Sequence, residues 1–124
     1  MEAERAIVDY NFLLKEFETC QKYHLIIPHP HIKTLEGLFS SDTKNISLYK
    51  VNQILDYLKE NAEILALSNL PQLHVKTKGI KSKTCRFVRY VLAARDIYPN
   101  LKVLSNSRET KFLLKQLDIP VSTK

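Results

Sequence analysis

The sequence RAIVD at residues 5–9 is followed directly by YNFLL at residues 10–14. The first segment is a short apolar run that ends in an acid, which predicts a β-strand. The second segment begins a pattern of apolar residues at helical spacing. An acid at such a junction lies at the carboxyl end of a strand, the edge where open α/β sheets bind their ligands. Asp9 is therefore the first candidate site residue.

Apolar runs of strand length alternate with helical patterns along the rest of the chain. Strands are expected at 5–9, 25–27, 101–104 and 119–121, with a weaker candidate at 73–75. Helices are expected at 10–23, from His29 onward, from a Ser47 cap to about residues 69–71, at Ser82–Ile97, and after an Asn106–Glu109 capping box. A polar loop is expected at Ser40–Asn45, and Pro120 limits the last strand to a sheet edge. The alternation predicts one α/β domain over residues 1–124, with three layers. Its mostly parallel central sheet would have four to five strands, with helices on both faces.

The composition narrows the class of protein. A length of 124 residues with 44% hydrophobic residues suits a single globular domain. No apolar run approaches a membrane span, and the polar start differs from a signal peptide, so no membrane partner is expected. Two cysteines, Cys20 and Cys85, predict free thiols in a reducing compartment, which places the chain inside the cell, in cytoplasm or nucleus. With two glycines in total, a phosphate-binding P-loop is excluded.

Positive charge is concentrated in the second half of the chain. Residues 1–71 carry seven Lys or Arg and ten Asp or Glu, whereas residues 72–124 carry twelve Lys or Arg and three acids. A stretch at residues 75–89 has no acid at all. A one-sided cationic stretch suits a polyanion, most simply nucleic acid. The candidate residues for binding nucleic acid are Lys76, Lys78, Lys81, Lys83, Arg86, Arg89 and Arg108.

A succession of motifs resembles the PIN domain family, most closely the eukaryotic PIN domains of mRNA surveillance and processing factors. The matching segments are IVDYNFL at 7–13, IIP at 26–28, IKTLEGL at 32–38, VLSNSRE at 103–109 and IPV at 119–121. The resemblance implies a nuclease-like fold in which three or four acids hold Mg²⁺ or Mn²⁺. That metal would activate water for phosphodiester cleavage. By this resemblance, Asp9 and Glu36 are the candidate catalytic and metal-binding residues.

Two acids typical of the family have no counterpart here. The helix before the fourth expected strand opens with Lys83-Thr84-Cys85-Arg86, and Asn106-Ser107 stands where the family has Asn-Asp. Two carboxylates provide too few oxygen ligands for Mg²⁺. The interpretation is therefore a degenerate site that binds single-stranded RNA without a cofactor. The alternatives are an active Mg²⁺- or Mn²⁺-dependent endoribonuclease and a protein-interaction module within an RNA-processing complex.

Cysteine and histidine residues gather in one short segment. Cys20, His24, His29 and His31 lie within twelve residues, and the first two have a one-turn spacing that can hold zinc. The set follows no standard zinc spacing. A buried thiol and surface imidazoles are the simpler interpretation of these residues.

Overall fold

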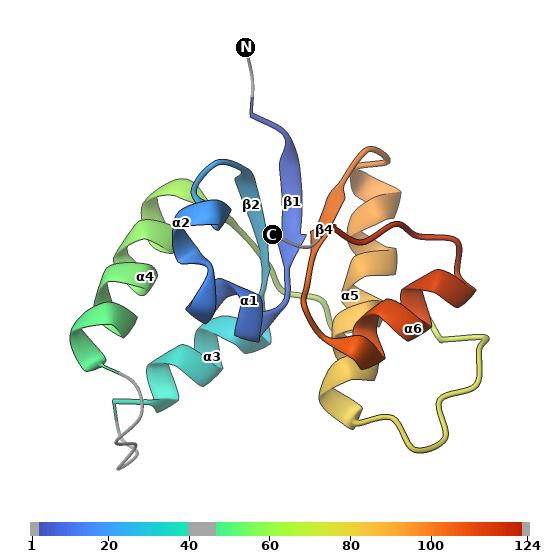
Figure 1. The fold of residues 1–124 in the computed structure, drawn as a ribbon. Helices are drawn as coiled ribbons and strands as arrows, with labels where there is room; N and C mark the ends of the chain where they lie inside the picture. Colours follow the sequence, from blue (N-terminus) through green and yellow to red (C-terminus); the bar gives the residue numbers. More distant parts are fainter. Residues whose placement is uncertain (1–2, 40–46, 123–124) are drawn as a thin grey trace.

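A parallel sheet forms the centre of the computed structural model, which describes residues 3–39 and 47–122 (Figure 1). The strands are β1 (Arg5–Val8), β2 (His24–Pro28), β3 (Glu63–Leu65) and β4 (Lys102–Leu104), in the order β3-β2-β1-β4. The helices in the described ranges are α1 (Tyr10–Lys15), α2 (Phe17–Cys20), α3 (His29–Gly37), α4 (Leu48–Asn61), α5 (Ser82–Ile97) and α6 (Arg108–Gln116). The predicted α/β class with a parallel sheet is confirmed.

Alternate residues of the central strand pack into two separate hydrophobic cores. Ala6 and Val8 of β1 belong to a cluster built with residues of α1, α3 and α4. Ile7, between them in sequence, belongs to a second cluster with residues of α5 and α6. Successive side chains of a strand point to opposite faces, and Figure 1 shows α1–α4 on one side of the strands and α5 and α6 on the other. A strand buried on both sides explains why residues 6–8 are all apolar.

The order of the strands creates a switch point between β1 and β4. From β1 the chain moves outward through β2 to β3, and then returns to place β4 on the other side of β1. In such sheets, ligands bind beyond the carboxyl ends of the strands where this reversal occurs. The residue after β1, Asp9, lies at this point, and its backbone N–H donates to Leu104 O at 2.9 Å.

Several predicted boundaries are confirmed. The helix predicted at Ser82–Ile97 has these bounds as α5, and α3 begins at His29 with Pro30 in its first turn. Ser47 caps α4, because its hydroxyl oxygen accepts a hydrogen bond from Lys50 N at 3.5 Å.

Two predicted helices were too long. The single helix expected at 10–23 is two short helices, separated by Glu16 with the non-helical angles φ −123° and ψ 41°. Buried residues such as Leu13 and Cys20 keep helical spacing across this break, so periodicity alone did not reveal it. The helix after Ser47 ends at Asn61, where the sequence had predicted an end near residues 69–71. Residues 63–65 instead pair with β2, and this long-range pairing overrides the local pattern.

The weak strand expected at 73–75 and the last strand expected at 119–121 were wrong. Residues 66–81 connect β3 to α5 without a strand, and apolar side chains of this connection pack against the second core. A turn there places Gly79 at φ +84°, a conformation that glycine adopts readily. Beyond α6, a single bridge joins Ser122 to Leu104 in parallel orientation. The end of the chain therefore lies beside the edge strand β4, as predicted, but forms no strand of its own within the described residues.

The cap of α6 differs by one residue from the expected one. Ser107, and not Asn106, is the N-cap, and its hydroxyl oxygen accepts from Thr110 N at 3.2 Å. Glu109 does not complete a capping box, because it lies two residues after this cap and not three. Its carboxylate instead accepts a hydrogen bond from Thr84 of α5.

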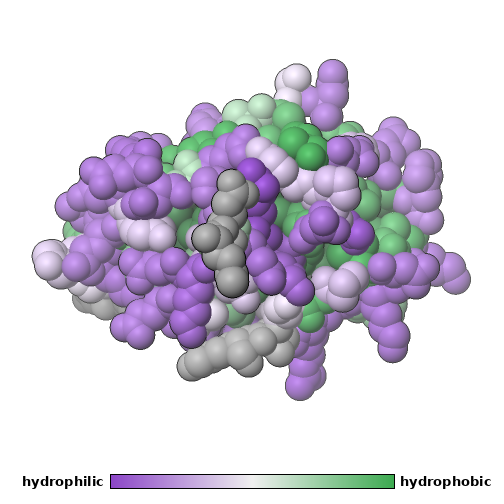
Figure 2. Space-filling model, turned by 90° about the horizontal axis from the view of Figure 1, so that it is seen from above, coloured by the Kyte–Doolittle hydropathy of each residue, from purple (hydrophilic) through white to green (hydrophobic). Residues whose placement is uncertain are grey.

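The surface at the amino ends of the strands is mainly hydrophilic. Figure 2 looks onto the amino ends of the strands, where hydrophilic residues dominate and hydrophobic residues show between them. Over the described part of the chain, no helix has both the length and the apolar character needed to cross a bilayer. The polar loop predicted at Ser40–Asn45 lies outside the described residues.

Candidate functional site

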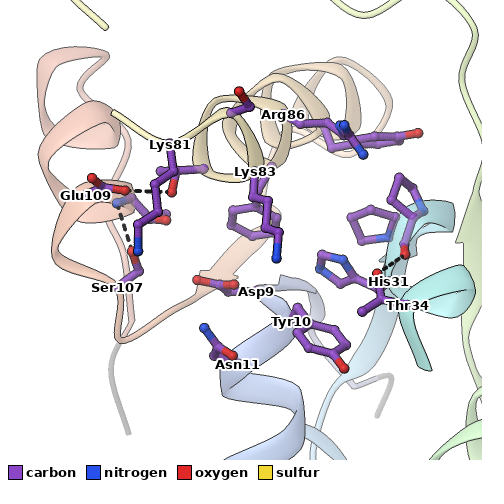
Figure 3. Close-up of a pocket in the computed structure, with 17 residues that line it drawn as sticks. Asp9, Tyr10, Asn11, His31, Thr34, Lys81, Lys83, Arg86, Ser107 and Glu109 are labelled. Carbon is purple, nitrogen blue, oxygen red and sulfur yellow. Dashed lines mark hydrogen bonds between the residues drawn. The ribbon is translucent and has the colours of Figure 1, made fainter. Parts of the chain in front are cut away.

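A cavity of about 760 Å³ opens at the carboxyl edge of the sheet, beside the switch point. The starts of α1 and α3 line it from one side of the sheet, and the starts of α5 and α6 line it from the other (Figures 1 and 3). Four elements that are distant in sequence therefore converge on one space. Its charged and aromatic side chains fall into three groups: carboxylates, aromatic rings and cations.

Asp9 is the carboxylate at the base of the cavity, and the protein holds it in place. The Ser105 hydroxyl donates to Asp9 Oδ2 at 2.8 Å, and Ser107 N–H donates to Ser105 Oγ at 3.1 Å. Asp9 is also the N-cap residue of α1, although its side chain accepts no capping hydrogen bond. The connection after β4 thus orients the acid that follows β1.

His31 forms part of the wall and is buried. Its Nε2 lies 2.9 Å from Val8 O, and because a carbonyl oxygen only accepts, Nε2 carries the proton. The ring stacks on Phe87 at 5.8 Å between centroids and meets Tyr10 edge to face at 5.8 Å. Burial lowers the pKa of His31 to about 4, although the Val8 carbonyl and the Asp9 charge oppose the shift. The imidazole is therefore neutral at physiological pH.

Lys81, Lys83 and Arg86 form the cationic side of the cavity, and all three are exposed. Lys81 is the N-cap residue of α5, and the other two lie in its first turns. Figure 3 shows Lys83 extending from α5 toward Asp9 and His31, while Lys81 points toward Ser107. The amino end of α5 adds partial positive charge to this side.

Glu109 is the second carboxylate of the cavity. Its Oε1 accepts a hydrogen bond from the buried Thr84 hydroxyl at 3.0 Å, which ties α6 to α5. Three cationic side chains and two carboxylates thus line the cavity. Each carboxylate is already bound by a hydroxyl of the protein, whereas the described structure shows no ion pair for the three cations.

The other predicted site residues lie outside this cavity. Glu36 is exposed near the end of α3 and is absent from the cavity lining, so the structure does not bring it together with Asp9 there. Thr34 of the same helix lines the cavity instead. Lys76 and Lys78 are exposed in the connection before α5, and Arg108 is exposed at the first position of α6.

Arg89 has a structural partner. Its Nε donates to Pro71 O at 2.9 Å and its Nη2 donates to Leu70 O at 3.1 Å. The guanidinium therefore anchors the connection at residues 66–81 to α5. This structural role accounts for an arginine at position 89 without any contact to nucleic acid. Arg89 is also not among the residues that line the cavity.

The donor set matches a divalent-metal centre poorly. Mg²⁺ and Mn²⁺ require several oxygen ligands, but the carboxylates of the cavity are Asp9 and Glu109, each bound by a hydroxyl and accompanied by three cations. Within residues 3–39 and 47–122, no three His, Cys, Asp or Glu side chains are grouped so that they could hold a metal ion.

The residues considered for zinc also serve other purposes. Cys20 is buried in the first core, and burial raises the pKa of its thiol to about 12, with a smaller contribution from Glu16. His24 is exposed at the start of β2, as expected of a surface imidazole. The same expectation was wrong for His31, which is buried and donates to Val8 O. The cysteines Cys20 and Cys85 are free thiols, as predicted.

The sequence interpretation missed the aromatic wall. Tyr10, His31 and Phe87 come from three different helices, and their positions in sequence carry no common motif. The available signal was indirect: His31 and Thr34 are three residues apart in a helix that follows a strand, so both face the carboxyl edge of the sheet.

No protein-family model matches the chain, and no curated protein matches it in sequence. The resemblance to PIN domains therefore stays a prediction from the motifs.

Proposed function

We propose that this chain is a PIN-like domain that binds single-stranded RNA at the carboxyl edge of its sheet and does so without cleaving it. The observation that carries the proposal is the convergence of Lys81, Lys83 and Arg86 on a cavity at the switch point. Cations that meet at the usual ligand site of an open α/β sheet suit an anionic ligand.

The state of the charged groups supports an anion over a cation. The carboxylates of Asp9 and Glu109 are each bound by a hydroxyl of the protein, while the cations are exposed. Lys76 and Lys78, in the connection before α5, and Arg108, at the start of α6, are further exposed cations outside the cavity. A strand longer than the cavity would contact these residues through its phosphates.

Single-stranded RNA fits this surface better than a duplex does. A flexible strand can bend into a recess between helices and direct bases away from its backbone, whereas an A-form duplex hides its base edges in a deep, narrow groove. A groove lined by cations and aromatic rings is the usual design for binding single strands with little sequence preference.

The proposal is tested by anisotropy titration of a labelled single-stranded RNA at several salt concentrations. The triple variant Lys81→Ala, Lys83→Ala, Arg86→Ala is expected to lose affinity and to lower the salt slope by about 2, at about 0.7 per phosphate contact in single strands. The matched control is Lys22→Ala, Lys50→Ala, Lys59→Ala, which removes the same charge from exposed positions outside the cavity. The control is expected to keep affinity within about twofold.

Three other results would overturn or replace the proposal. Equal loss of affinity in both triple variants, or none in either, would show that the cavity cations do not bind RNA. Cleavage of the RNA in Mn²⁺ that disappears with Asp9→Asn would show a nuclease. If the wild-type chain does not bind RNA but a partner protein does bind this surface, the interaction-module alternative is supported.

A further inference from the structure

The cavity has two chemically different sides. Lys81, Lys83 and Arg86 form the cationic side, and the rings of Tyr10, His31 and Phe87 form a continuous aromatic row. Neighbouring rings of this row are each 5.8 Å apart between centroids. Figure 3 shows Lys83 directed toward the labelled members of the row, Tyr10 and His31.

Phosphate binding alone does not explain the aromatic side. A phosphate group needs cations and N–H donors, both of which α5 provides, and it gains nothing from an apolar wall. Aromatic rings beside cations instead suit a ligand with a flat π-system joined to a phosphate. The volume of about 760 Å³ lies within the range of small-molecule pockets.

We infer that the cavity holds one nucleotide, with its base against Tyr10 and His31 and its phosphate on Lys81, Lys83 and Arg86. This inference rests on the proposed function and deepens it: the bound strand would place one unpaired base in the cavity while neighbouring phosphates follow the exposed cations outside. Tyr10 is the main contact surface for the base, because it is half-buried, whereas Phe87 is almost fully buried.

His31 contributes a defined hydrogen-bonding group to this site. Because Nε2 donates to Val8 O, the neutral ring has its lone-pair acceptor on Nδ1. Nδ1 makes no hydrogen bond within the described structure, in which every buried side-chain nitrogen or oxygen has a partner, so Nδ1 is open to solvent. An acceptor in the wall complements an amino group of a base, such as that of adenine, and adenosine 5′-monophosphate is therefore the probe.

The experiment compares adenosine 5′-monophosphate with ribose 5-phosphate, which has the same sugar and phosphate but no base. Binding of each to the full chain is measured by amide chemical-shift titration, and saturation-transfer difference NMR identifies the ligand protons in contact. We expect the nucleotide to bind at least about fivefold more tightly, since one stacked base contributes at least that factor. The strongest saturation is expected on the base protons.

Substitutions on the aromatic side and on the cationic side of the cavity test the two contacts separately. Tyr10→Ala is expected to weaken the nucleotide by about fivefold or more and to leave ribose 5-phosphate unchanged. Lys83→Ala is expected to weaken both ligands. The matched control is Tyr49→Ala, because Tyr49 is 74% exposed on α4 and lies outside the cavity. Should Tyr10→Ala fold poorly, the wild-type comparison and its saturation pattern still decide the question.

The outcomes separate this inference from the function on which it rests. Equal affinity for the two ligands, or no binding of either, overturns the nucleotide site even if the RNA titration succeeds. Loss of affinity in Tyr49→Ala equal to that in Tyr10→Ala also overturns it. Failure of the wild-type chain to bind RNA at all overturns the proposed function independently.

Discussion

Acid is expected to destabilise this domain through one buried imidazole. The pKa of His31 is about 4 in the folded protein, against an ordinary value of 6.5, because burial disfavours the charged ring. Between these two values the unfolded chain binds a proton that the folded chain does not. The contribution of His31 to the free energy of unfolding is therefore fully present above pH 6.5. It is lost as the pH drops toward 4 and does not change further below that. The difference corresponds to about 3 kcal/mol.

The measurement is urea unfolding, followed by circular dichroism, from neutral pH down to about pH 4. Carboxylates titrate in every variant, so the comparison of interest is between wild type and His31→Gln. Glutamine keeps a side-chain N–H donor for Val8 O but does not titrate. We expect the free energy of unfolding of His31→Gln to fall by about 3 kcal/mol less than that of wild type over this range.

His24→Gln is the matched control, because His24 is exposed, and it should keep the full pH dependence of wild type. The reasoning is refuted if His31→Gln loses as much stability on acidification as wild type does. That result would mean that His31 is protonated in the folded state as easily as in the unfolded chain.

Three further predictions each concern one residue. Arg89→Gln removes the charged donor to the connection at residues 66–81, so hydrogen exchange of that segment should accelerate and stability should fall by about 1–3 kcal/mol; normal protection would contradict the anchoring role. Native Cys20, whose thiol is buried with a raised pKa, should resist a thiol reagent that labels the partly exposed Cys85, and mass spectrometry of the labelled native protein checks this. Ser107→Ala removes the cap of α6 and should lower the free energy of unfolding by about 1 kcal/mol, whereas an unchanged urea midpoint would show that the cap contributes nothing.

Local patterns were sufficient for the elements whose signals are strong and self-contained. Residues 6–8 are apolar on both faces, which is typical of a central parallel strand, and α5 has its predicted bounds. The pattern failed where pairing decided the outcome. Residues 63–65 continue a helical spacing but form β3, because β2 offers an open edge for hydrogen bonding.

The same division applies to the candidate site. Asp9 and the cations Lys81, Lys83 and Arg86 could be selected from the sequence, since an acid at a strand end and a cationic stretch are both local features. The sequence also suggested Glu36, which the fold leaves outside the cavity. Helical geometry explains this, because residues two apart point in very different directions, so Thr34 and Glu36 cannot share one face.

The sequence by itself determined the α/β class, the acid that ends the first strand and the positive charge of the second half. Only the tertiary structure decided that Tyr10, His31 and Phe87 form one wall and that Arg89 is an anchor. The physical reason is the range of the interactions: propensity and periodicity act between neighbours in sequence, whereas a cavity at a sheet edge is made by segments that meet only when the strands pair.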